Sequence, residues 1–200
     1  MNHPRMEFNS GQDASGGVGD FLSGQALETR TILMFGVFTP ALAQRVSQQL
    51  LLLAARAPDD IKLLINAQGG QAPDGEMLFD LVRGLGPRVL VIGAGAVAGA
   101  PALAFVAPPR EQRFCLPHAR FSLAQRLDMN LPAGADAATA LAAMQAMVAH
   151  RERLTRLFAE QMGQPVALVA QEVAREDWLD AEEALAHGLV GRIVTSASAV

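Results

Sequence analysis

Residues 91–101 read VIGAGAVAGAP, and this stretch indicates the fold class of the chain. Its first residues are apolar and β-branched, which favours a buried strand. The Gly/Ala run that follows favours a tight turn, and Pro101 suits the first turn of a helix. We therefore expect a strand, a sharp turn and a helix in succession, with Val97 at the exposed tip of the turn.

Such a turn can expose a single side chain, and serine hydrolases use one to present their nucleophile. Val97 has neither a hydroxyl nor a thiol, so it cannot attack a carbonyl carbon or pass a proton to a base. The sequence therefore predicts the architecture of a hydrolase without its nucleophile.

Strand-like and helix-like segments alternate on both sides of this turn. Thr39 suits the N-cap of a helix and Pro40 its first position. The pattern predicts one α/β domain built of repeated β-α units around a mainly parallel sheet, with residues 1–25 as a flexible arm, 26–195 as the domain and 196–200 as a tail. Strands are expected at 31–37, 61–66, 88–93, 113–116, 120–123 and 189–194, and helices at 40–57, 73–85, up to 107, 136–162, 165–174 and 181–187.

Composition excludes several classes of function. The net charge of −4 argues against a nucleic-acid surface. Cys115 is the single cysteine, so an intrachain disulfide is impossible. The four histidines show no metal-ligand spacing, and we expect neither a metal nor another cofactor. With no apolar run of roughly 18 residues and no signal-peptide core, the expected location is the cytoplasm, without a membrane partner.

Five motifs occur in the order found in the proteolytic subunit of the Clp protease, and residues 27–194 resemble that family. The motifs are LLINAQGG (63–70), GAGAVAGA (93–100), RFCLPHAR (113–120), GQP (163–165) and WLDAEEA with HGLV (178–184 and 187–190). The resemblance implies the Clp/crotonase fold with a protruding helix–strand handle, here about residues 125–162.

The resemblance places the family's catalytic serine, histidine and aspartate at Val97, Ala124 and Glu172. Two of these positions are aliphatic, and the third is a longer carboxylate with no imidazole to orient. The family's oxyanion pocket uses two backbone amides, which fall at Gly70 and Ala98 and do not depend on side chains. Lys62, the single lysine, lies in a predicted strand away from the turn and cannot serve a Ser-Lys dyad.

Other reactive side chains have simpler interpretations. Cys115 is expected to be a small buried hydrophobe, and Ser122 and His118 to be a strand serine and a turn histidine. The carboxylates around 177–183 are expected to cap a helix start, where the positive end of the helix dipole stabilises them.

The favoured interpretation is a catalytically silent Clp-peptidase-like subunit with a structural or regulatory role in a ring-shaped, ATP-dependent protease complex. The ring would be homomeric or shared with active Clp-type subunits. The family also implies an AAA+ unfoldase partner, although residues 1–25 differ from its axial loop. Two alternatives remain: a crotonase-like acyl-thioester enzyme using the two-amide pocket, with Asp74 or Glu76 as base, and a serine peptidase with a displaced triad.

Overall fold

The computed structural model describes residues 24–126, 134–175 and 177–200. A parallel sheet forms its centre, with strands in the order β1-β2-β3-β4-β6, and β5 pairs with the end of β3. The strands are β1 (Thr31–Val37), β2 (Ile61–Gln68), β3 (Val89–Ala98), β4 (Arg113–Cys115), β5 (Arg120–Ser122) and β6 (Arg192–Ile193). This confirms the predicted α/β fold with a mainly parallel sheet.

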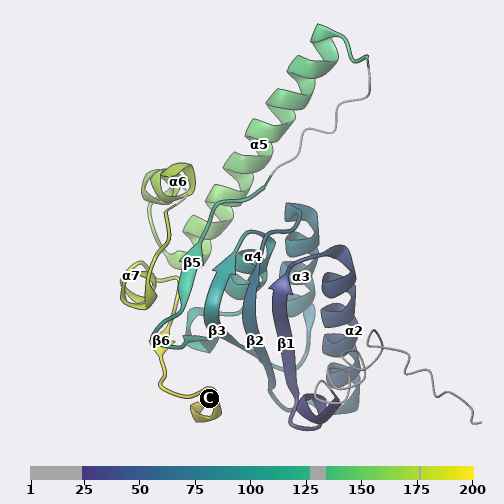
Figure 1. Cartoon of the computed structure of the whole chain (residues 1–200), viewed down its shortest axis with the longest axis vertical. Coiled ribbons are helices and arrows are strands. Elements are labelled where there is room, and N and C mark those ends of the chain that lie inside the picture. Colours follow the sequence, from purple (N-terminus) through teal and green to yellow (C-terminus); the bar gives the residue numbers. More distant parts are fainter. Residues whose placement is uncertain (1–23, 127–133, 176) are drawn as a thin grey trace, which may run out of the picture.

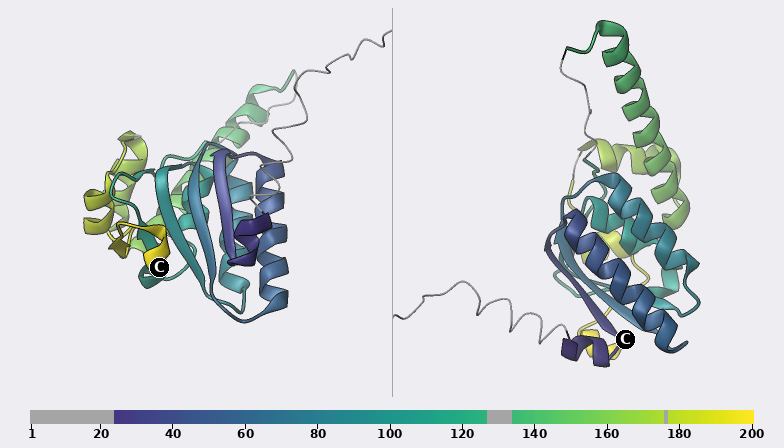
Figure 2. Two further views of the ribbon diagram at one scale, coloured as in Figure 1. Left: turned by 60° about the horizontal axis from the view of Figure 1, so that its bottom comes forward. Right: turned by 90° about the vertical axis from the view of Figure 1, so that its right-hand side faces the viewer.

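Three helices follow the first three strands and cover one face of the sheet (Figures 1 and 2). They are α2 (Pro40–Arg56), α3 (Ala72–Gly84) and α4 (Ala100–Val106). As predicted, Thr39 caps α2: its hydroxyl oxygen accepts a hydrogen bond from the Leu42 amide, and Pro40 opens the helix. The buried core lies between these helices and the sheet, and all seven residues of α4 are buried.

The long strand β3 pairs with two short strands in succession. Residues Val91 to Gly93 pair with β4, and residues Ala96 to Ala98 pair with β5. The register between β2 and β3 shifts next to Asn66, where the Asn66 carboxamide oxygen accepts a hydrogen bond from the Ala96 amide. This contact fixes the last part of β3, which leads into the turn before α4.

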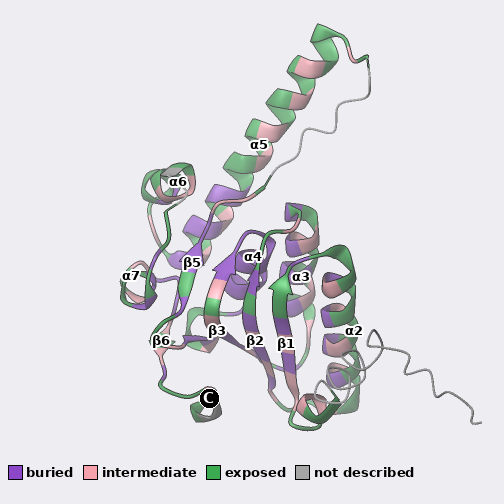
Figure 3. Ribbon diagram, viewed as in Figure 1, coloured by how far each residue is buried: buried purple, intermediate pink, exposed green. Residues whose placement is uncertain are grey.

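Helix α5 (Ala137–Met162) projects away from the sheet (Figure 1). Asp136 caps its start through a hydrogen bond from the Thr139 amide, and Gly163 ends it in the left-handed conformation. Only its last turns are buried (Figure 3), at Leu154, Thr155, Phe158, Ala159 and Met162. The handle was expected to begin near residue 125, but residues 127–133 lie outside the described part of the chain.

The chain then returns to the body through α6 (Val166–Arg175) and α7 (Ala181–Ala186). Asp180 and Glu183 form a capping box at the start of α7, as expected for the carboxylates of this stretch. The strand expected at 189–194 is reduced to the two residues of β6. The predicted arm, residues 1–25, lies almost wholly outside the described residues. None of the described helices is long and apolar enough to span a bilayer.

Candidate functional site

The turn between β3 and α4 is present, but the prediction that Val97 stands at its exposed tip is wrong. Val97 is fully buried within β3, where it pairs with Ala67 on one side and Phe121 on the other. The strand continues to Ala98, so the turn falls two residues later, at Gly99. Gly99 has φ 69° and ψ −140°, a conformation that side chains other than glycine adopt only under strain. Gly99 is therefore the residue at which the chain turns from β3 into α4.

The space beside Gly99 is filled by backbone. A Cβ atom on Gly99 would lie 2.6 Å from the carbonyl oxygen of Gly69 and 3.1 Å from its amide nitrogen. The same carbonyl oxygen accepts a hydrogen bond of 3.0 Å from the Ala100 amide. The Gly69 peptide therefore packs against Gly99 and leaves no space for a side chain at this residue.

The predicted oxyanion-binding amides belong to the residues next to Gly69 and Gly99. Ala98 is the last residue of β3 and pairs with Ser122. Gly70, the other predicted donor, has φ 78° and lies close to the Phe38 ring. The two-amide pocket at Gly70 and Ala98 stays a prediction.

Ala124 follows β5 and lines a pocket with α5 and α6. Its methyl group cannot accept a proton, so this position offers no general base. The next residue, Gln125, reaches the turn instead: its side-chain amide nitrogen donates to the Gly99 carbonyl at 2.9 Å and to the Leu123 carbonyl at 3.4 Å. Gln125 thus links the end of β5 to Gly99, a role that sequence reasoning missed.

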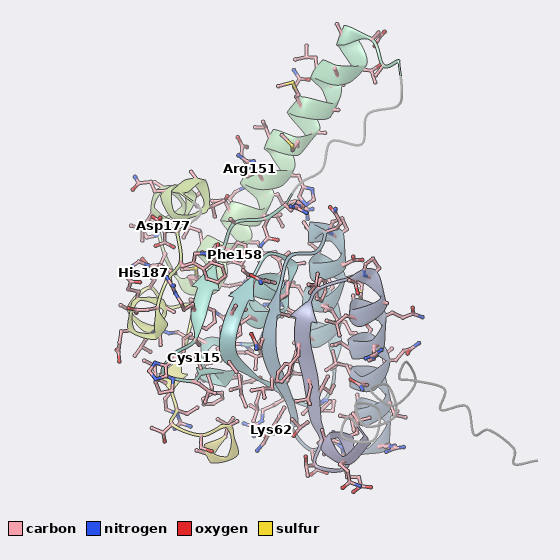
Figure 4. The ribbon with its side chains drawn as sticks, in the orientation of Figure 1. Lys62, Cys115, Arg151, Phe158, Asp177 and His187 are labelled. Carbon is pink, nitrogen blue, oxygen red and sulfur yellow. The ribbon has the colours of Figure 1, made fainter. Side chains whose placement is uncertain are left out.

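Glu172 lies on α6 and has a partner that the sequence did not reveal. Its Oε1 is 2.6 Å from Nδ1 of His187, which follows α7, and its side chain is 15% exposed. Burial raises the pKa of the Glu172 carboxyl, and the nearby His187 partly opposes this effect. The two residues are 15 positions apart, on separate elements, so no periodicity in the sequence links them. Figure 4 shows His187 on the α6–α7 side of the sheet.

The remaining candidates have structural roles. Cys115 is fully buried, and burial raises its pKa to about 11, so the thiol stays protonated at neutral pH. Ser122 is buried in β5, and within the described residues no hydrogen bond joins it to a histidine. Lys62 lies at the start of β2, at the opposite end of the parallel sheet from Gly99 (Figure 4).

Glu76, one of the two carboxylates considered as a base, is already occupied. It lies on α3, where it forms an ion pair with Arg153, and its other oxygen is 3.3 Å from Nε2 of His150. Both partners belong to α5, so Glu76 holds the protruding helix against the body. No pattern in the sequence indicated this contact, because α3 and α5 are far apart along the chain.

The parallel sheet, the strand–turn–helix at Gly99 and the protruding α5 define a Clp/crotonase-type α/β domain. The family model described as Clp protease matches residues 18–197. An "ATP-dependent Clp protease proteolytic subunit 3" of Rhizobium meliloti is 45% identical over 172 residues, which cover 84% of this chain and 85% of that protein. The chain therefore belongs to the Clp protease proteolytic subunit family.

Other relatives agree across most of the length. An "ATP-dependent Clp protease proteolytic subunit 2" of Pseudomonas aeruginosa is 37% identical over 93% of this chain and 91% of its own. The solved structure of ClpP1 from Listeria monocytogenes superposes with a TM-score of 0.76 at 34% identity, covering 89% of this chain and 98% of the other. Both the family and the fold expected from the sequence are thus confirmed.

Proposed function

We propose that this chain is a catalytically silent subunit of a Clp-type ring, with a structural or regulatory role beside active subunits. One observation carries the proposal: Val97, which the motif alignment places at the nucleophile, is an aliphatic residue fully buried within β3. Ala124 offers no base, and the Glu172 carboxylate is engaged with His187. The proposal keeps the three triad positions at Val97, Ala124 and Glu172, as the resemblance places them.

The names of the relatives describe proteolytic subunits, so cleavage is the outcome to measure. The purified protein is treated with a fluorophosphonate probe and with fluorogenic peptides, beside an active Clp peptidase as the control. We expect neither labelling nor cleavage, because loss of a single triad member typically removes orders of magnitude of rate. Stoichiometric labelling of any serine would overturn the proposal, and the labelled residue would identify a displaced nucleophile.

The ring role is tested separately by native mass spectrometry. The protein is analysed alone and after co-expression with an active Clp-type peptidase subunit from the same cell. We expect an oligomer in at least one of the two samples. A monomer of about 21 kDa in both samples would contradict the scaffold role.

The structure gives the two alternative functions less support. A crotonase-like acyl-thioester site needs a free carboxylate base, whereas Glu76 is held by Arg153 and His150. A displaced triad would require a serine bound to a histidine, and Ser122 shows no such bond in the described part of the chain.

A further inference from the structure

A cleft lies on the helical side of the sheet, at the end where the strands begin. The starts of β3 and β4 meet the C-terminal ends of α3, α4 and α5 there. This is the end of the sheet that carries Lys62 (Figure 4), and Gly99 follows the other end of β3. The volume of the cleft is about 460 Å³, within the range of sites that bind small molecules. The cleft is therefore separate from the candidate site and large enough for a ligand.

The charged side chains on the walls of this cleft are cationic. Arg83 and Arg88 line it together with Gln112 and Gln161, and its other described lining residues are apolar or glycine. Arg88 is neutralised by an ion pair with Asp60, which does not line the cleft. Among the described residues, Arg83 has no carboxylate within ion-pair distance. The cleft therefore carries an excess positive charge at Arg83.

The guanidinium of Arg83 is held in place without being used up. It lies over the Phe79 ring, 5.4 Å from the centroid, and its Nη1 donates to Oε1 of Gln161 at 3.1 Å. Within the described residues this is its single hydrogen bond, although a guanidinium has five N–H donors. A planar cation that is already oriented loses little entropy on binding, so Arg83 is suited to bind an oxyanion.

A second cation, Arg113, is buried directly behind the wall of the cleft. Its side chain donates to the carbonyl oxygens of Pro108 at 2.7 Å and Gln161 at 2.9 Å, and both of these residues line the cleft. Burial lowers the pKa of Arg113 to about 10, Glu111 opposes this effect, and nearby arginines add to it, so the guanidinium stays charged at neutral pH. No carboxylate of the described residues lies within ion-pair distance of it. A buried charge without a counter-charge is costly, so an anion in the cleft would stabilise Arg113.

We propose that this cleft binds a small organic phosphate, a phosphate monoester attached to an apolar body. The phosphate accepts hydrogen bonds from Arg83 in the field of Arg113, and its charge of nearly −2 matches these two cations. The apolar body packs against the wall that includes Leu85 and Pro108. Gln112 makes no side-chain hydrogen bond within the described residues and is available to a polar group of the ligand. The site does not depend on whether the chain cleaves peptides.

The test is calorimetric titration of the full chain at pH 7.5 with phenyl phosphate and with benzenesulfonamide, a neutral compound of similar size. We expect phenyl phosphate to bind at least about tenfold more tightly, the ratio that one charge-assisted hydrogen bond supplies. Inorganic phosphate should bind severalfold more weakly than phenyl phosphate, because it leaves the apolar wall uncovered. Phenyl phosphate that fails to bind, or binds no more tightly than either of the other two, would overturn the proposal.

Adenosine monophosphate distinguishes two sources of the phosphate. Tighter binding than that of phenyl phosphate would assign the cleft to a nucleotide, and weaker binding would assign it to a simpler aromatic phosphate. Both outcomes support an organic phosphate site.

Two charge variants locate the phosphate. Arg83→Gln should reduce the preference for phenyl phosphate over the neutral compound to about twofold or less, because the direct hydrogen bonds are lost. Arg45→Gln removes the same charge from an exposed site on α2 and should leave the preference unchanged. A preference that survives in Arg83→Gln would contradict the assignment of the phosphate to this residue.

A further variant separates binding in the cleft from general attraction to surface charge. Gly86 lines the cleft, and no heavy atom lies within 4 Å of the place where its Cβ would stand, so Gly86→Phe puts a ring into the open space. We expect this variant to lose phenyl phosphate binding although every arginine is kept. Gly84→Phe adds the same ring at the end of α3, outside the lining and with equally open surroundings, and should bind as the original chain does. Circular dichroism checks the fold of each variant, and unchanged binding by folded Gly86→Phe would overturn the proposal.

Discussion

Gly99 combines a positive φ angle with a neighbour that leaves no space for a Cβ atom. These are two separate obstacles to a side chain, since one is conformational and the other is steric. Gly163 has a similar φ of 66° but a ψ of 30°, the left-handed helical conformation, and no heavy atom lies within 4 Å of the place where its Cβ would stand, so a side chain there meets only a milder conformational strain. A comparison of serine substitutions at Gly99 and Gly163 therefore measures how much a side chain at Gly99 destabilises the folded chain.

We predict that Gly99→Ser lowers the free energy of unfolding by more than about 2 kcal/mol, because strain and overlap with Gly69 add. Gly163→Ser should cost about 1 kcal/mol, for conformational strain alone. Urea denaturation measures both. Gly99→Ser should also remain unlabelled by fluorophosphonate, since Ala124 supplies no base. Equal losses in the two variants would mean that the Gly69 peptide moves aside without cost.

Glu172 is a residue whose burial makes stability depend on pH. Its carboxyl pKa in the folded chain lies above the usual 4.5, first because of burial. Just above pH 4.5 the unfolded chain releases this proton while the folded chain keeps it, so this group's contribution to stability falls as pH rises.

We predict that Glu172→Gln removes this fall, because glutamine does not titrate. The measurement is the urea midpoint of both proteins at pH 4.5, 5.5 and 6.5, where the titratable groups that do not contact Glu172 are shared and cancel in the difference. The stability of the original chain relative to the variant should decrease with pH. A difference that increases with pH would mean that the pairing with His187 outweighs burial.

At the scale of elements, Arg30 joins β1 to the end of α2. It is the one described non-glycine residue with a positive φ, 53°. Its guanidinium donates to the carbonyl oxygens of Leu53 and Ala57, both at 3.1 Å, at the C-terminal end of α2. It also binds the carbonyls of Asp59 and Asp60, at 2.7 and 3.1 Å.

We predict that Arg30→Met lowers the free energy of unfolding by about 1–3 kcal/mol, because charged hydrogen bonds to these carbonyls are lost. Arg56→Met, which removes an exposed charge from the last turn of the same helix, should change it by less than about 0.5 kcal/mol. Thermal or urea denaturation of the two variants measures both changes in the free energy of unfolding. Equal effects would show that charge near the helix end matters and that the hydrogen bonds of Arg30 do not.

At the scale of the whole molecule, the outer half of α5 carries a stripe of exposed apolar side chains. Leu141, Met144 and Val148 are 57%, 51% and 54% exposed, and their spacing puts them on one side of the helix. Met147 and Leu157, on the same helix, are half-buried, and Leu157 packs against the core. An exposed stripe of this kind is suited to contact with another subunit.

We predict that Met144→Glu weakens assembly while the fold stays intact. Ala146→Glu places the same charge on the opposite side of α5 and should leave assembly unchanged. Sedimentation velocity at tens of micromolar compares the two variants, and circular dichroism checks the fold. Equal assembly of Met144→Glu and the original chain would show that the apolar stripe takes no part in the contact between subunits.

The order of the elements and many of their bounds followed from the sequence alone. The first strand was predicted at its observed residues, and Thr39 and Pro40 opened α2 as expected, because capping and periodicity act between neighbours in the chain. The third strand, expected at 88–93, instead runs to Ala98, and the last strand, expected at 189–194, has two residues. The sequence also predicted that no nucleophile occupies the turn, since valine, alanine and glycine fill every position from 93 to 100. The handle was expected from the family resemblance and stays a prediction.

Which residue stands at the turn depends instead on tertiary packing. Val97 is buried because β5 pairs with the end of β3 and extends that strand by several residues, a contact that local sequence does not specify. The Gly69 carbonyl beside Gly99, the pairing of Glu172 with His187 and the hydrogen bond from Gln125 to Gly99 have the same origin. Each depends on segments far apart in the chain that meet only when the helices pack on the sheet.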